Sequence, residues 1–116
     1  MNVYEFAART ADVIERCGHT RHKYYDRATG GVCLQGAERL VLTGTFAYPH
    51  GCDTRVATEL NKLIELEAGT SDVVTWNDYI VRDGAEVIAT LRAIAARDPN
   101  KQQSKETITE PELVLA

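Results

Sequence analysis

Two short motifs each place a cysteine beside a histidine, a pairing that could bind metal. Cys-Gly-His occupies residues 17–19, and the reverse order, His-Gly-Cys, occupies residues 50–52. Thiolate and imidazole are ligands that tetrahedral zinc prefers, but structural zinc sites usually separate their paired ligands by two to four residues rather than one. The spacing therefore gives only weak support for a zinc site, and we expect the chain to hold no metal. They are Cys17, His19, His50 and Cys52.

Nucleophilic catalysis is a second chemistry that these residue types allow. A Cys–His pair oriented by Asp78 or Asp83 would have the necessary groups. The sequence contains no Gly-x-Ser-x-Gly, Walker A or His-Glu-x-x-His motif. Cys33 falls on the buried face of a predicted helix, where a thiol is usually inert. A small enzyme is therefore the third of three functional hypotheses, and we expect no cofactor.

Basic residues are concentrated between positions 16 and 27, although the whole chain has a net charge of −4. Tyr24 and Tyr25 lie in the same segment and could stack on bases. This combination suits a small nucleic-acid-binding module, which is the second hypothesis. A helix-turn-helix fits poorly, because the loop predicted at 46–53 is longer than the usual turn. The basic residues of the segment are Arg16, Arg21, Lys23 and Arg27.

Protein binding is the first hypothesis, and it rests on aromatic and arginine residues in two irregular segments, 19–27 and 46–53. Tyrosine and arginine are enriched among the residues that dominate the energy of protein interfaces. We expect these two loops to form the contact surface for a partner protein. The expected partner-binding residues are Arg21, Lys23, Tyr24, Tyr25, Arg27 and Tyr48.

Four helices must position these loops. Apolar residues recur at helical spacing over residues 3–17, 32–45, 54–68 and 84–97. Asp83 and Glu86 have the spacing of a capping box for the last helix. Gly36 lies inside the second helix, where glycine costs about 1 kcal/mol relative to alanine. We expect a neighbouring helix or Trp76 to approach Gly36 closely in compensation.

Trp-Asn-Asp at residues 76–78 contains the only tryptophan of the chain. We expect Trp76 to be buried at the centre of the core, because its large ring is costly to leave in water. Asn77 and Asp78 suit a turn whose side chains bond to nearby backbone. A role in recognition or catalysis is the alternative, and we favour the structural role.

Two motifs resemble those of a known family. Cys33-Leu34-Gln35-Gly36-Ala37 resembles a Cys-Leu-x-Gly-Ala signature, and Trp76-Asn77-Asp78 followed by Arg82 and Glu86-Val87-Ile88 resembles a Trp-Asn-Asp signature followed by a helix. Together they resemble a family of small proteins from actinobacteria and their phages that is named only as a domain of unknown function. The resemblance spans roughly residues 6–96. It implies a helical domain and a phage setting, but no activity or catalytic residue.

The sequence therefore predicts one all-α domain over residues 1–98, with about four helices in a compact bundle, two irregular loops and a flexible tail at 99–116. A tiny β-hairpin is allowed at 23–31. We expect a non-enzymatic, phage-type accessory protein that binds a host protein in the host cytoplasm. No apolar run is long enough to span a membrane. Small residues that would permit homodimerisation by close helix packing are Gly36, Ala37 and Gly44.

Overall fold

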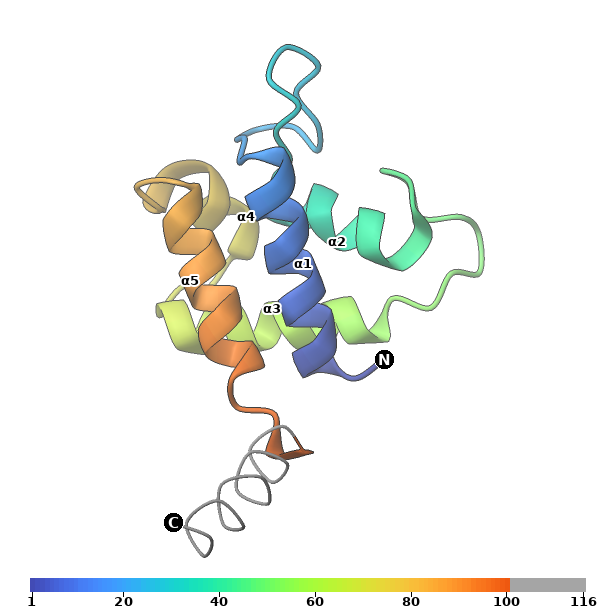
Figure 1. Cartoon of the computed structure of the whole chain (residues 1–116), viewed down its shortest axis with the longest axis vertical. Coiled ribbons are helices and arrows are strands. Elements are labelled where there is room, and N and C mark those ends of the chain that lie inside the picture. Colours follow the sequence, from blue (N-terminus) through green and yellow to red (C-terminus); the bar gives the residue numbers. More distant parts are fainter. Residues whose placement is uncertain (101–116) are drawn as a thin grey trace, which may run out of the picture.

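The computed structural model describes residues 1–100, and over this range the chain is helical and contains no β-strand (Figure 1). The four long helices confirm the predicted all-α class. A short helix and a π-helical turn, η1, lie between the third and the last of them. The elements are α1 (Val3–Cys17), α2 (Leu34–Thr43), α3 (Arg55–Ala68), α4 (Val73–Thr75), η1 (Trp76–Ile80) and α5 (Gly84–Ala95).

Helix α1 is the central element. It packs along α5 and also contacts α2 and α3, while α3 contacts α5 (Figure 1). Phe6 and Ile14 of α1 meet Leu60 of α3 and Leu91 of α5 in the core, and each is almost completely buried. Burying each such side chain contributes roughly 1.5–3 kcal/mol. The loop between α1 and α2 therefore projects from one end of a well-anchored helix.

Side-chain caps define where the first and last long helices begin. The Asn2 side chain accepts a hydrogen bond from the Glu5 N–H at 2.8 Å. Asp83 accepts from the Glu86 N–H at 3.1 Å, as the predicted capping box requires. The return bond differs from the prediction, because Glu86 accepts from the N–H of Arg82 at 2.7 Å and not from that of Asp83.

Helix α2 starts two residues later and ends two residues earlier than the sequence predicted. Cys33 is its N-cap and not part of its buried face, since the Cys33 sulfur accepts from the Gly36 N–H at 3.3 Å. Val32 is extended, and its N–H donates to the Gly18 carbonyl at 2.9 Å. Gly44 ends the helix in the left-handed conformation, at φ 76°.

The possible hairpin at 23–31 is reduced to a turn and two isolated bridges. Val32 pairs with His19 in parallel and with Tyr25 in antiparallel fashion. The Gly30 N–H donates to the Asp26 carbonyl at 2.7 Å and closes the turn. Too few residues pair to make a strand, so the segment depends on contacts with the rest of the domain.

The Trp-Asn-Asp segment is helical and not the isolated turn that the sequence predicted. η1 continues α4, and the Val81 N–H donates to the Trp76 carbonyl at 3.0 Å, which is the i→i+5 bond of a π-helix. Trp76 is 2% exposed, so its predicted burial is confirmed. Helix α5 ends at Ala95, two residues earlier than predicted, and the Asp98 N–H then donates back to the Ala95 carbonyl.

Gly36 is needed because a loop crosses α2 directly above it. A Cβ atom at Gly36 would lie 2.2 Å from the carbonyl oxygen of Tyr24. The close neighbour is thus loop backbone, and neither another helix nor Trp76, as the sequence had suggested. Backbone cannot swing aside as a flexible side chain can, so only glycine fits beneath this crossing.

Within residues 1–100, no helix combines the length and apolar character needed to cross a membrane. Residues 101–116 of the expected tail at 99–116 lie outside the described residues.

Gly36→Ala should lower the free energy of unfolding by about 1–3 kcal/mol, the usual cost of overpacking, even though alanine favours helix. Urea denaturation measures the change. Gln35→Ala, on the same turn of α2, is the matched control and should stay close to wild type. A Gly36→Ala variant as stable as wild type would contradict the close approach of Tyr24.

Candidate functional site

The side-chain amide of Asn77 joins three separate segments of the chain. Its oxygen accepts from His19 Nε2 at 2.7 Å and from the Leu34 N–H at 3.1 Å. Its nitrogen donates to the Thr20 carbonyl at 3.3 Å and to Asp78 Oδ1 at 2.8 Å. Asn77 is 3% exposed, and these four bonds use every donor and acceptor position of the amide. The amide therefore ties the loop after α1, the start of α2 and η1 together.

Asp78 extends this network to His22. Asp78 Oδ1 accepts from the His22 N–H at 2.9 Å, and Asp78 Oδ2 lies 3.6 Å from His22 Nδ1. Burial by itself would raise the pKa of Asp78, but the hydrogen bonds from His22 and Asn77 and the charge of His22 and His19 lower it below its usual value. His22 has φ 67°, a left-handed conformation that is strained for a side chain other than glycine.

Arg21 closes the C-terminal end of η1. Its guanidinium donates to the carbonyls of Val81 at 2.7 Å and Asp78 at 3.0 Å, and to those of Arg82 and Asn77 at longer range. Carbonyls at the end of a helix lack hydrogen-bond donors within the helix, and the Arg21 guanidinium supplies these donors. The guanidinium that the sequence assigned to a partner is thus engaged within the chain.

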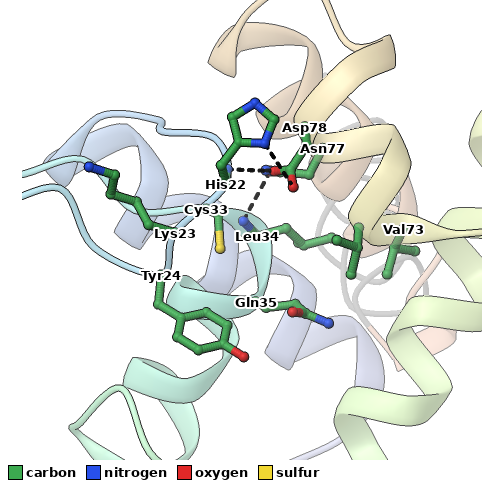
Figure 2. A pocket seen from close by; sticks show the side chains of 10 residues that line it. His22, Lys23, Tyr24, Cys33, Leu34, Gln35, Val73, Asn77 and Asp78 are labelled. Carbon is green, nitrogen blue, oxygen red and sulfur yellow. Dashed lines mark hydrogen bonds and ion pairs between the residues drawn. The ribbon is translucent and has the colours of Figure 1, made fainter.

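These bonds frame a pocket of ≈ 340 Å³, hereafter the Asn77 pocket (Figure 2). Tyr24 and Lys23 come from the loop after α1, while Val73 approaches from α4. The Cys33 sulfur lies between Tyr24 and the Asn77–Asp78 segment. The lining residues are His22, Lys23, Tyr24, Cys33, Leu34, Gln35, Val73, Val74, Asn77 and Asp78.

Exposed apolar side chains lie on α4 and η1, the elements that supply Val73, Val74, Asn77 and Asp78 to the lining of the Asn77 pocket. Val74 on its wall is 41% exposed, and the neighbouring Tyr79 and Ile80 are 73% and 56% exposed. The Tyr79 ring meets the edge of the His22 ring, with centroids 4.9 Å apart. An apolar patch beside a pocket commonly marks an interaction site. The sequence did not reveal this patch, because η1 was expected to be a buried turn.

The Asn77 pocket brings Cys33, His22 and Asp78 together, yet it does not prepare a nucleophile. The Cys33 sulfur accepts from the Gly36 N–H. Burial raises the pKa of the Cys33 thiol, although hydrogen bonds from Gly36 and Gln35 oppose that rise. A thiol with a raised pKa is a poor nucleophile at neutral pH. The arrangement is better suited to binding than to covalent catalysis.

Stacked side chains bring the two predicted binding loops together across α2. The guanidinium of Arg39 lies over the Tyr24 ring at 4.4 Å and over the Tyr48 ring at 4.3 Å. Tyr25 stacks on Phe46, with ring centroids 5.1 Å apart. Tyr24 and Tyr25 remain 42% and 41% exposed, so each also presents a surface to solvent.

The other predicted site residues are dispersed. Arg27 is exposed in the turn after Tyr25 and lies outside the Asn77 pocket. Among residues 1–100, no three His, Cys, Asp or Glu side chains converge as metal ligands. The candidate zinc set therefore does not assemble; it comprised Cys17, His19, His50 and Cys52.

Glu38 forms the centre of a second, smaller site that the sequence did not suggest. It is 1% exposed on α2, and burial raises the pKa of its carboxyl group to about 8, despite the nearby positive charge of Arg39. Glu38 lines a cavity of ≈ 170 Å³, hereafter the Glu38 cavity. The other lining residues are Gln35, Arg39, Tyr48, Thr54, Ala57, Thr58 and Asn61.

Residues 2–97 match a family described as a family of unknown function (DUF6197), and the chain belongs to it. No curated protein and no solved structure matches the chain. The match confirms that the chain belongs to a family without an assigned activity.

Asn77→Ala should lower the free energy of unfolding by about 2–3 kcal/mol, because it leaves buried groups such as the Leu34 N–H without a hydrogen-bond partner. Thermal unfolding followed by circular dichroism checks this. Asn2→Ala removes another asparagine that bonds to backbone, at an exposed helix cap, and should cost only about 1 kcal/mol. Equal losses in the two variants would show that Asn77 has no special structural role.

Glu38→Gln should alter how stability depends on pH. Because folding raises the pKa of Glu38 from 4.5 to about 8, the folded state holds the proton more tightly, and stability falls as the pH rises through this window. Through this titration, the free energy of unfolding of the wild type falls by about 1.4 kcal/mol per pH unit at most. Urea titrations at several pH values should show Glu38→Gln gaining stability over wild type as the pH rises.

Glu59→Gln is the matched control, because Glu59 is exposed on α3. Its stability should follow the wild-type pH profile. A Glu38→Gln profile parallel to wild type would contradict a buried, neutral Glu38.

Proposed function

We propose that this member of the DUF6197 family is a non-enzymatic binding protein whose Asn77 pocket receives an apolar side chain of a partner protein. The observation that carries this proposal is the combination of an open pocket with the exposed side chains of Val74, on its lining, and Tyr79, which contacts His22 of the lining. Exposed apolar groups are costly in water, and a partner that covers them recovers that free energy.

The dimensions and rigidity of the Asn77 pocket support the proposal. A volume of ≈ 340 Å³ is at the lower end of the range for small-molecule sites and is ample for one leucine or aromatic side chain. Asn77 and Arg21 fix the walls before any partner arrives, which lowers the entropy cost of binding. Lys23, His22 and Asp78 supply polar and charged groups that could orient the partner.

The proposal also includes the biological setting of the protein. We infer a phage-type accessory protein that acts on a host protein in the host cytoplasm. Its support is the resemblance of the Cys-Leu-x-Gly-Ala and Trp-Asn-Asp motifs, at residues 33–37 and 76–78, to proteins of actinobacteria and their phages. Residues of both motifs also line the Asn77 pocket, which connects the resemblance to the proposed site.

Binding of nucleic acid by the segment 16–27 is the second candidate. Lys23 and Arg27 are exposed and available to phosphates. Arg21 is occupied by backbone carbonyls, while Tyr24 and Tyr25 already stack on side chains of the domain. Fewer groups remain for a nucleic acid than the sequence implied, so protein binding is the stronger proposal.

Val74→Arg should abolish capture of the partner protein, because it places a charge on the apolar wall of the Asn77 pocket. The experiment captures partners from a nuclease-treated host lysate, identifies the protein retained and titrates it in purified form. Val74→Arg should weaken its affinity at least tenfold, which corresponds to about 1.4 kcal/mol. The Val74 side chain is exposed, so the variant should remain folded.

Leu66→Arg is the matched control, because Leu66 is 80% exposed on α3 and does not line the pocket. It should bind like wild type. Equal binding by Val74→Arg and wild type would refute the pocket, and retention of nucleic acid alone would favour the second candidate. Retention only of further copies of this chain would identify a homodimer in place of a host protein.

A further inference from the structure

We propose that the Glu38 cavity binds a small free amino acid as its zwitterion, with the ammonium group held by Glu38 and Asn61 and the carboxylate held by Arg39. This site is separate from the Asn77 pocket, and the proposal does not depend on the function proposed for that pocket. Among residues 1–100, Gln35 alone lines both.

Within residues 1–100, three buried polar atoms on residues that line the cavity have no hydrogen-bond partner. They are Glu38 Oε2, Asn61 Oδ1 and Arg39 Nε. Leaving a buried polar atom unpaired destabilises a folded protein, so three such atoms on residues that line one cavity call for an explanation. Asn61 Oδ1 and, in the ionised carboxylate, Glu38 Oε2 accept hydrogen bonds, whereas Arg39 Nε donates one. A ligand that carries a cationic donor at one end and an anionic acceptor at the other complements all three.

Contacts with two tyrosine rings and a backbone carbonyl hold the Arg39 side chain in place. Its guanidinium lies between the rings of Tyr24 and Tyr48, and its Nη2 donates to the Tyr24 hydroxyl at 3.2 Å. The Phe46 carbonyl receives a further, longer bond from Nη1. The other nitrogens are thus engaged while Nε is left free. Glu38 and Arg39 therefore each present an unpaired polar atom, since within residues 1–100 neither Glu38 Oε2 nor Arg39 Nε has a hydrogen-bond partner.

The volume restricts the ligand to a small molecule. A cavity of about 150 Å³ accommodates benzene, a molecule of six heavy atoms. The Glu38 cavity, at ≈ 170 Å³, is suited to a ligand of similar or slightly larger size, such as alanine or serine. The hydroxyl groups of Thr54 and Thr58 on the lining add polar contacts that a short side chain could use.

Binding of the ammonium group should be coupled to release of a proton. Burial raises the pKa of Glu38 to about 8, so the empty cavity holds mainly the neutral acid at pH 7. An ammonium group stabilises the ionised carboxylate and so displaces that proton. Arg39 and Tyr48 also line the cavity, and burial raises the pKa of the Tyr48 hydroxyl above its usual value, so Tyr48 takes no part in this proton release at pH 7.

Titration of the full-length protein with L-alanine, followed by calorimetry and by amide NMR shifts of α2 and α3, tests the proposal. We expect one site with a dissociation constant of about 1 mM or lower and release of close to one proton at pH 7. Propionate lacks the ammonium group and ethylamine lacks the carboxylate, so each should bind at least tenfold more weakly. Glu38→Gln and Asn61→Leu should each weaken alanine binding at least tenfold, whereas the exposed Glu59→Gln should not.

Water, or an Asn61 amide turned over to donate to Glu38, would satisfy the same atoms without a ligand. In either case alanine would cause no saturable shift at Glu38 or Asn61, and the proposal would be overturned. Propionate or ethylamine binding as tightly as alanine would overturn it too, as would a folded Glu38→Gln variant that binds alanine normally. Thermal unfolding of each variant confirms that any lost binding reports on the cavity and not on the fold.

Discussion

The structure depends on one buried amide. Asn77 makes four hydrogen bonds from a position that is almost closed to solvent, and these reach the loop after α1, the first turn of α2 and Asp78. A buried amide that is fully bonded stabilises one arrangement strongly, because any displacement leaves a donor or acceptor unpaired. The bridges around Val32 are too few to hold the loop in place. The hydrogen bonds of Asn77 therefore fix the position of the loop after α1.

The functional surfaces follow from this constraint. Once the loop is fixed, Tyr24 crosses Gly36 and reaches Arg39, whose guanidinium connects it to Tyr48. The first turn of α2 then lines the Asn77 pocket and its next turn lines the Glu38 cavity, and both use Gln35. The strained backbone of His22 is held by the same network through Asp78. A rigid frame with open, partly apolar recesses suits binding better than it suits covalent catalysis.

The sequence predicted the helices well because their signals are local. Apolar spacing and the Asp83 cap depend only on neighbouring residues, and they located α1, α3 and α5 closely. The structure places Lys23 and Tyr24, which the sequence assigned to partner binding, around one pocket with Cys33, Asn77 and Asp78, which the sequence assigned to structural motifs. The sequence could not show that Arg21 caps η1, since that contact joins residues about sixty positions apart. The unpaired carboxyl oxygen of Glu38 was equally hidden, because burial of a charged residue inside an amphipathic helix leaves no mark in the local pattern.

Hydrogen exchange measured by NMR on wild type and Asn77→Ala tests the central claim most directly. The Leu34 amide donates to Asn77 and the His22 amide donates to Asp78, whereas the Glu86 amide belongs to the separate cap of α5. If Asn77 organises the loop and the pocket, the Leu34 and His22 amides are protected in wild type and lose protection in the variant, while Glu86 is unchanged. Protection of Leu34 and His22 that is the same in both proteins would contradict the account.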